Sequence, residues 1–197
     1  VWVEIEYFIS LSKLGLKAFP EISEENQTFL RTIYQNFNEE GANQIKEIEK
    51  TTNHDVKAVE YFIKNKLKGT SIEPFSEFVH FGLTSQDINN TAVPFSLQLG
   101  IDEVLIPTIK NSLERIESFA KEWKKIPLLS RTHGQAATPT TVGKEFAVFA
   151  ERIRIQLETL IHTPVSAKFG GATGAFNAHR LAFPDVNWPE FGDQLVN

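Results

Sequence analysis

The chain has 197 residues, a formal net charge of −5 at pH 7 and a pI near 5.6. Hydrophobic residues make up 41% and charged residues 23%, the usage of a soluble globular protein with one sizeable core. The acidic balance argues against a nucleic-acid partner, which needs a basic surface. The absence of cysteine excludes disulfides, thiolate catalysis and thiolate metal sites, and it fits a reducing cytoplasmic location.

No signal-peptide pattern opens the sequence, and no apolar run reaches the roughly 18 residues that a membrane-spanning helix needs. We therefore expect no membrane partner. The first residues, Val1 to Ile5, already follow a periodic apolar pattern, and Asp193 to Asn197 carry no helix-terminating signal. From these two ends we expect a fragment of a longer protein.

Apolar residues recur every three or four positions through nearly the whole chain, which is the pattern of amphipathic helices. Four helices are expected before Gly69. Ser23 is placed to cap the second helix, and the third is expected to be short and to follow Gly41. In the fourth helix, Glu60 and Lys64 are spaced to pair across one turn.

Longer helices are expected in the second half of the chain. A helix that starts near Thr84 contains Pro94, which predicts a kink or an early end there. Another runs from Val104 to Trp123, and a third begins at Pro139 with Thr138 as its cap. Strand-like alternation is essentially absent. Long helices joined by polar loops predict an all-α, elongated helical bundle.

The first of four polar clusters, Thr51–Asp55, opens the fourth helix. Thr52 or Asn53 can cap that helix, and the charge of Asp55 complements its dipole. The alternative is anion binding by His54 and the free backbone N–H groups of the helix start. The residues alone favour capping.

The second cluster surrounds the start of the next helix. Thr84 and Asp87 can form a capping box, in which each side chain bonds the backbone N–H of the other. Capping does not explain Ser85 or Asn89, because asparagine is a poor helix-interior residue. Hydroxyls and amides exposed at a helix start can seat a carboxylate or a phosphate. His80 follows apolar residues and is expected to be packed and hydrogen-bonded.

The third cluster places His133 on a short polar loop just before a strongly amphipathic helix. Gly134 would allow close backbone approach, and Gln135 could bind a substrate amide or carboxylate. A histidine held by polar neighbours on a rigid loop is a good general acid or base. A structural histidine is the alternative, and the residues alone do not decide between them.

In the fourth cluster, Gly170, Gly171 and Gly174 can form either an anion-binding backbone nest or a flexible turn. A nucleotide P-loop is excluded, because the lysine-serine ending and the preceding strand are missing. His162 and His179 lack metal-ligand spacing, so no metal site is expected. No cofactor is expected either. Four polar clusters, each at a helix end, suggest one composite site.

Three motifs resemble the adenylosuccinate lyase family of the aspartase/fumarase superfamily: TTNHDVKAVEYF at 51–62, LTSQDINN at 83–90 and PLLSRTHGQ at 127–135. The resemblance runs through nearly the whole chain. It implies the L-aspartase-like helical fold, truncated before the end of the central helical domain. Residues 1–80 would be the N-terminal helical domain and 81–197 the first part of the central domain, with the C-terminal domain absent.

The activity that the resemblance implies is a β-elimination. It releases fumarate from adenylosuccinate, giving AMP, and from the succinyl-carboxamide ribotide of purine synthesis. Carried over by position, His133 would be the general acid that protonates the departing nitrogen. The implied substrate-binding residues are Asn53, His54, Asp55, Thr84, Ser85 and Thr132, with Thr84 and Ser85 holding a succinyl carboxylate.

The resemblance also implies that half of the catalytic machinery is missing. The family's catalytic serine lies on a loop of the form Ser-Ser-x-Met-Pro-x-Lys-x-Asn-Pro, which has no counterpart here, and Ser85 is not that serine. The family builds each active site from three subunits of a homotetramer. We therefore expect a lyase with a small-molecule substrate as the full-length protein, and an inactive fragment.

Two alternatives remain at this point. One is another fumarate-releasing lyase of the superfamily, acting on argininosuccinate, fumarate or aspartate. The residues Asn53-His54-Asp55 and the length of the match around His133 disfavour it. The other is a non-catalytic helical assembly module, which the intact polar clusters disfavour.

Overall fold

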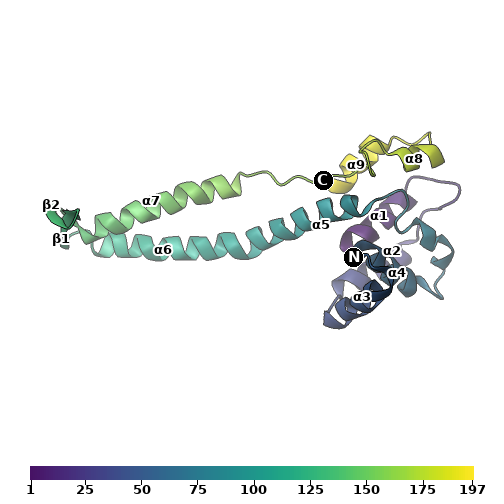
Figure 1. Cartoon of the computed structure of the whole chain (residues 1–197), viewed down its shortest axis with the longest axis horizontal. Coiled ribbons are helices and arrows are strands. Elements are labelled where there is room, and N and C mark those ends of the chain that lie inside the picture. The colour runs from purple at the N-terminus through teal and green to yellow at the C-terminus, as the bar shows by residue number, and fades with distance from the viewer. The chain divides into compact units, whose positions relative to one another are not determined.

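The computed structural model describes all 197 residues, and the chain forms two compact units (Figure 1). The first unit combines Val1–Pro94 with Ser166–Asn197, and the second unit is Phe95–Val165. The division into 1–80 and 81–197 refers to the domains of a longer protein and stays a prediction. Within this chain the last 32 residues, 166–197, belong with the N-terminal helices.

The first unit is helical. Its elements are α1 (Trp2–Ser12), α2 (Glu24–Gln35), α3 (Glu39–Thr52), α4 (Asp55–Leu67), the short 3₁₀ helix η1 (Glu73–Phe78), the first part of α5 (Ser85–Gly100), α8 (Asn177–Ala182) and α9 (Trp188–Val196).

The core of the first unit forms around α1. This helix is apolar on nearly all sides, and Tyr7 and Phe8 have no exposed surface. A helix that is hydrophobic all round must be covered on every face. Trp188 of α9 is also fully buried in this core, and its Nε1 donates a hydrogen bond to the carbonyl of Phe183 at 3.0 Å. The C-terminal segment therefore completes the core that the N-terminal helices begin.

Local capping rules account for several helix ends. Ser23 caps α2, as predicted, by accepting a hydrogen bond from the N–H of Asn26 at 3.3 Å. The predicted pair of Glu60 and Lys64 is also confirmed, at 2.9 Å. The prediction of a short helix after Gly41 was wrong, because the side chain of Asn38 caps α3 three residues earlier.

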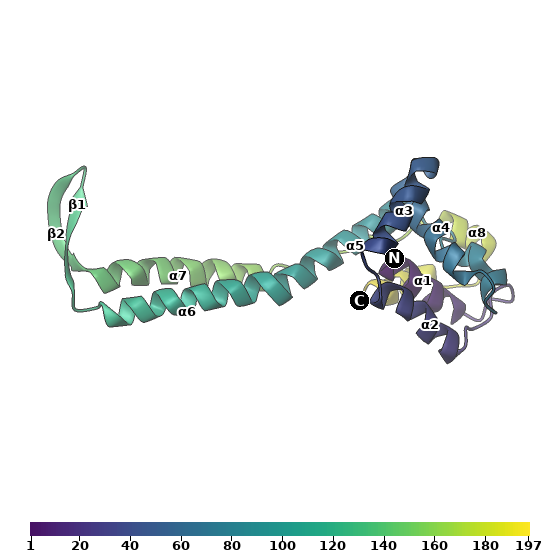
Figure 2. The ribbon, with the colours of Figure 1, turned by 90° about the horizontal axis from the view of Figure 1, so that it is seen from below.

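The second unit contains the rest of α5, the π-helical segment η2 (Ile101–Leu105), α6 (Ile106–Glu122), the strands β1 (Pro127–Thr132) and β2 (Gln135–Thr141), and α7 (Val142–Ile161). Figure 2 shows α6 and α7 side by side, with the two strands at the end where α6 leads into α7. Leu113, Ala150 and Leu157 are the buried residues of this helix pair.

The two strands form an antiparallel hairpin that the sequence did not predict. Pro127 pairs with Thr141 and Thr132 pairs with Gln135. The prediction of a helix from Pro139 was therefore wrong: α7 begins at Val142, after a cap by the hydroxyl of Thr141. Most side chains of both strands are exposed, so no alternation of apolar and polar residues marks them.

Of the kink or early end predicted at Pro94, the early end does not occur, because α5 continues to Gly100. Proline has no N–H, so the carbonyl of Asn90, four residues earlier, loses its intrahelical partner. The backbone N–H of Lys168 donates to that carbonyl at 3.3 Å. A segment from the far end of the chain therefore satisfies the acceptor that Pro94 leaves open.

The helical residues Ser85–Glu122 are long and apolar enough to cross a membrane, judged by length and composition alone. None of the most apolar part of this helix is buried within the chain. This is weak evidence for a membrane helix, because helices of soluble proteins meet the same criteria.

Candidate functional site

His133 lies at the tip of the β1–β2 hairpin. Thr132 pairs with Gln135, so His133 and Gly134 form a two-residue turn. Both have positive φ, 49° at His133 and 77° at Gly134, which is the pattern of a type I′ turn. Histidine adopts this left-handed conformation more readily than most side chains, though at a cost relative to glycine or asparagine. The hairpin therefore presents an imidazole at a position where the turn conformation alone would favour asparagine or glycine.

The side chains at this tip are free to meet a ligand. Thr132 and His133 are exposed, and neither side chain makes a hydrogen bond within the chain. The guanidinium Nη1 of Arg131 donates to the carbonyl of Gly134 at 3.4 Å, across the turn. The expectation of a short polar loop is thus replaced by a hairpin turn, which holds His133 on paired backbone.

Residues Asn53, His54 and Asp55 form the junction between α3 and α4. Asn53 ends α3 in the left-handed conformation, with φ 49°. His54, rather than Thr52 or Asn53, is the N-cap of α4: its Nδ1 accepts a hydrogen bond from the N–H of Lys57 at 3.2 Å. The predicted cap position was therefore one or two residues too early.

The cap determines which nitrogen of His54 carries the proton. A nitrogen that accepts a hydrogen bond must be unprotonated, so the proton of the neutral ring is on Nε2. The 3.4 Å contact between Nδ1 and Oδ1 of Asp55 would be an ion pair only if the ring were doubly protonated, and the cap would then be lost. His54 is exposed, so its Nε2–H is available as a donor.

Thr84 and Ser85 lie at the start of α5. The backbone N–H of Thr84 donates to Oδ2 of Asp87 at 2.9 Å, which is one half of the predicted capping box. The other half differs from the prediction, because the hydroxyl of Thr84 lies 3.2 Å from the same carboxylate oxygen and donates to it. The hydroxyl of Ser85 is half-buried and makes no hydrogen bond within the chain.

Asp87 is the central residue of this region, although its position in the sequence predicts only a helix cap. Its side chain has no exposed surface. The N–H groups of Gly170 and Gly171 donate to Oδ1 at 3.0 Å each, and Nζ of Lys168 donates to Oδ1 at 2.8 Å. Of the two alternatives for the glycine cluster, a nest or a flexible turn, the structure has the nest, and the anion in it is the carboxylate of Asp87.

The environment of Asp87 keeps its carboxylate charged. Burial acts to raise the pKa, but the hydrogen bonds from Lys168 and from the backbone of Thr84 and Gly170 outweigh it, so the pKa lies below its usual value. No spacing rule could have joined Asp87 to Gly170 and Gly171, because more than 80 residues separate them along the chain.

His80 is packed and hydrogen-bonded, as predicted. Its Nδ1 lies 2.6 Å from Oε1 of Glu4, which is fully buried in α1. Burial raises the pKa of Glu4. Burial lowers the pKa of His80, but the hydrogen bond and the charge of Glu4 outweigh that effect and leave it raised. This pair ties α1 to the segment that leads into Thr84.

The structure places the predicted site residues in three groups. Asn53, His54 and Asp55 form one group and Thr84 and Ser85 a second, both in the first unit; Thr132 and His133 form the third, in the second unit. No hydrogen bond or ion pair joins the first two groups directly. No group of three His, Cys, Asp or Glu side chains is arranged to hold a metal ion.

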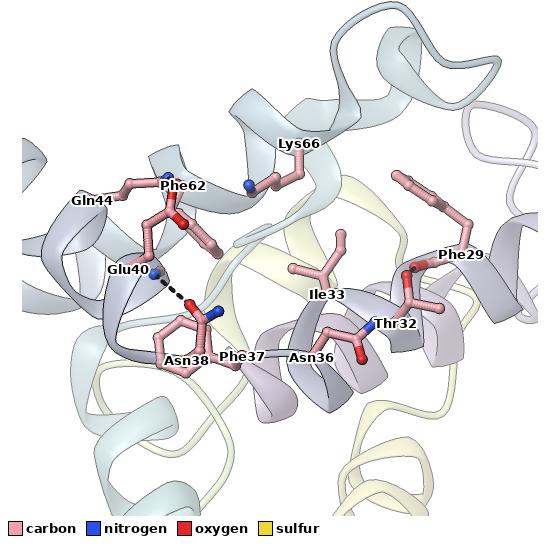
Figure 3. A pocket seen from close by; sticks show the side chains of 11 residues that line it. Phe29, Thr32, Ile33, Asn36, Phe37, Asn38, Glu40, Gln44, Phe62 and Lys66 are labelled. Carbon is pink, nitrogen blue, oxygen red and sulfur yellow. Dashed lines mark hydrogen bonds between the residues drawn. The ribbon is translucent and has the colours of Figure 1, made fainter.

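A pocket of about 350 Å³ opens elsewhere in the first unit, among α2, α3 and α4 (Figure 3). Phe29, Ile33, Phe37 and Phe62 supply apolar walls, and Lys66 contributes an ammonium group. None of the predicted site residues lines this pocket. It is therefore separate from the four polar clusters.

Residues 4–194 match the family model described as Lyase. The chain belongs to this lyase family.

Within the family, the chain is similar to adenylosuccinate lyases. It is 54% identical to that of Dictyostelium discoideum, over 100% of this chain and 43% of that protein. The adenylosuccinate lyase of Vibrio cholerae is 44% identical over 98% of this chain, and that of Escherichia coli is 42% identical over 100%. In both cases the alignment covers 43% of the relative. The chain thus spans less than half the length of these relatives.

Solved structures of low sequence identity share the fold. Fumarate lyase from Mesorhizobium sp. BNC1 aligns with a TM-score of 0.75 at 18% identity, over 100% of this chain and 44% of that one. The β-carboxy-cis,cis-muconate cycloisomerase from Acinetobacter calcoaceticus sp. ADP1 aligns with a TM-score of 0.73 at 18% identity, over 98% and 44%. These alignments confirm the predicted all-α fold class.

Proposed function

We propose that this chain is part of an adenylosuccinate lyase, which releases fumarate from adenylosuccinate and from the succinyl-carboxamide ribotide of purine synthesis. In this β-elimination a base removes a proton from the succinyl Cβ, and the C–N bond breaks. The departing nitrogen takes up a proton, so protons and charge balance without a cofactor or a metal. The identity to adenylosuccinate lyases over the whole chain supports this substrate choice.

His133 is the proposed general acid. A departing amine nitrogen is a poor leaving group unless it is protonated as the bond breaks, and imidazole is suited to proton transfer near neutral pH. The single observation that carries the proposal is the position of His133 at a positive φ on the hairpin tip, exposed and without an internal hydrogen bond. A conformation that costs energy is kept where the surrounding structure holds a functional group in place.

The other predicted residues are proposed to bind the substrate. The substrate carries carboxylates and a phosphate, so it needs hydrogen-bond donors and positive ends of dipoles. Two helix starts offer these: α4, capped by His54 with Asn53 and Asp55 beside it, and α5, with Thr84 and Ser85. Thr132 is proposed to contact the substrate next to His133.

The base is proposed to come from outside these 197 residues. The family resemblance assigns it to a serine on a mobile loop that has no counterpart in the sequence. The chain would therefore supply the acid and part of the substrate site, and we expect no lyase activity from these residues alone. Fumarate release by the 197-residue chain would contradict this assignment.

The proposed partners are a small-molecule substrate and other copies of the chain, in a cytoplasmic homotetramer. The second unit supports self-association, since it has a small core and leaves large apolar side chains exposed on several elements, including Val104, Leu105, Phe149 and Ile155. A helix pair with this much exposed apolar surface gains stability when further helices cover it. The proposal includes no nucleic-acid or membrane partner.

The deciding experiment uses the full-length protein in a fumarate-release assay, with adenylosuccinate and argininosuccinate as parallel substrates. We expect release from adenylosuccinate only. The variant His133→Asn then tests the acid, because Asn-Gly is the preferred type I′ turn and should keep the hairpin folded. Turnover should fall by at least about 100-fold, at the lower end of what general acid catalysis contributes.

Two outcomes would count against the proposal. Preference for argininosuccinate would point to a different lyase of the superfamily. Near-normal turnover by a folded His133→Asn protein would remove His133 as the acid.

A further inference from the structure

The hydrogen bonds around Asp87 have a consequence for the proposed carboxylate site at the start of α5. Thr84 has two hydrogen-bond donors, its backbone N–H and its hydroxyl, and both are directed at Oδ2 of Asp87, at 2.9 and 3.2 Å. A substrate carboxylate accepts hydrogen bonds and cannot donate them. While Asp87 holds both donors, Thr84 has none to offer the substrate.

Ser85 is in the opposite situation. Its hydroxyl is half-buried and has no partner within the chain. It is also the first residue of α5, so its own backbone N–H has no intrahelical acceptor. Ser85 therefore offers a free hydroxyl at the positive end of a helix dipole, which suits a carboxylate.

We propose that Asp87 is a positioning residue for this site: it anchors the first turn of α5 to the segment 168–171, so that Ser85 rather than Thr84 presents its hydroxyl to the substrate carboxylate. The inference rests on the proposed function, and it narrows the proposed pair of carboxylate-binding residues, Thr84 and Ser85, to Ser85. The anchor joins parts of the chain that are far apart in sequence, through two backbone N–H groups and the ammonium of Lys168.

The anchor is stiff for two reasons. Its carboxylate is completely buried and each oxygen has more than one donor, so rotation of the side chain would leave buried donors unpaired. The adjacent N–H of Lys168 also bonds the carbonyl of Asn90, one turn further along α5. The start of the helix is therefore held at two successive turns by one segment.

The test compares three variants of the full-length protein. In Asp87→Asn the side chain keeps its shape, but the amide nitrogen cannot accept a hydrogen bond, so donors lose their partner. We expect its KM for adenylosuccinate to rise by about 10- to 100-fold with kcat reduced less than about 3-fold, because the lost interaction positions bound substrate. Asp185→Asn, at an exposed residue without side-chain hydrogen bonds, is the matched control and should leave both constants unchanged.

Lys168→Gln is the third variant, and it keeps the proposal testable if Asp87→Asn does not fold. The side chain of Lys168 is 38% exposed, so its replacement strains the core less. It should also raise KM for adenylosuccinate, by a smaller factor than Asp87→Asn does. A folded Asp87→Asn protein with the wild-type KM would overturn the proposal. If Asp87→Asn does not fold, a wild-type KM in Lys168→Gln would overturn it instead.

A measurement without substrate separates this proposal from the proposed function. Hydrogen exchange at the amides of Thr84, Gly170 and Gly171 should be faster in Asp87→Asn, or in Lys168→Gln if the former does not fold, than in the wild type. Unchanged exchange would contradict the anchor whatever the enzyme's substrate is. If exchange is faster in the variant but the wild-type protein releases no fumarate from adenylosuccinate, the proposed function is rejected and the anchor stands.

Discussion

The α-carbon of Gly82 lies directly against the imidazole ring of His179. A Cβ at position 82 would be 2.6 Å from Cε1 and 2.7 Å from Nε2 of that ring. Gly82 also has a positive φ of 69°. His179 has no exposed surface, and Tyr7 and Trp188 are among the aromatic rings around it. Glycine is therefore required at position 82 for both space and backbone conformation.

Gly82→Ala should destabilise the protein by about 3 kcal/mol, because it combines backbone strain with overpacking of the core. The matched control is Gly15→Ala. Gly15 has nearly the same φ, 68°, but no atom within 4 Å of an added Cβ. Its substitution should cost only the backbone strain, about 1 kcal/mol. Thermal melting of the two variants measures the difference, and equal losses would show that His179 yields to the methyl group.

Gly143→Ala should separate α7 from α6. A Cβ at position 143 would lie 2.3 Å from the carbonyl oxygen of Ala120 and 2.5 Å from the backbone nitrogen of Lys124. These backbone atoms belong to α6 and to the turn that follows it, and neither can move without shifting that segment, so we expect a loss of about 2–4 kcal/mol. Gly100→Ala is the control, since an added Cβ in α5 meets nothing within 4 Å and alanine favours the helix. If Gly143→Ala melts at the same temperature as the control, the close approach of Gly143 to the backbone of Ala120 and Lys124 would be contradicted.

The protein should lose stability as the pH falls from about 6.5 to 4, through His179. Burial lowers the pKa of His179 from 6.5 to about 4. In this range the unfolded chain binds a proton that the folded chain does not, so acidification favours unfolding, by up to about 3 kcal/mol below pH 4. The Nε2 of His179 lies 3.1 Å from the hydroxyl of Tyr7, which donates its own hydrogen to the carbonyl of Phe81.

His179→Gln provides the comparison for this pH dependence. Glutamine can still donate a hydrogen bond to Tyr7 but does not titrate, so the variant should lack this part of the acid destabilisation. Urea unfolding of both proteins at pH 7 and pH 4.5 measures the loss of stability in each. Other titrating groups such as Glu4 and His80 are present in both proteins, so their contributions cancel when the two losses are subtracted. Parallel losses in the two proteins would contradict the lowered pKa of His179.

His54→Asn separates capping from substrate binding. Asparagine is among the best N-cap residues, so α4 should stay capped and the melting temperature should change by less than about 2 °C. The variant loses the imidazole Nε2–H, and we expect kcat/KM of the full-length enzyme to fall by about 100-fold, or about 2.7 kcal/mol. Normal kcat/KM would reduce His54 to a helix cap.

Much of the helical structure could be predicted from local sequence. Ser23 caps α2 through the N–H of Asn26, and Glu60 pairs with Lys64. Each interaction joins residues within four positions of each other, so its spacing is visible in the sequence. The hairpin could not be predicted, because strands exposed on both faces lack alternation. The position of His133 was recognised, but its support was assigned to a loop instead of a turn between paired strands.

The sequence by itself determined the helical class, most helix positions and the residues that resemble a lyase site, since these depend on periodicity and on motifs within short windows. Only the tertiary structure decided which anion fills the glycine nest, which nitrogen of His179 meets Tyr7, and which carbonyl satisfies Lys168. Each of these contacts joins segments more than 70 residues apart. Such partners meet only when the core around α1 has formed, so no local pattern records them.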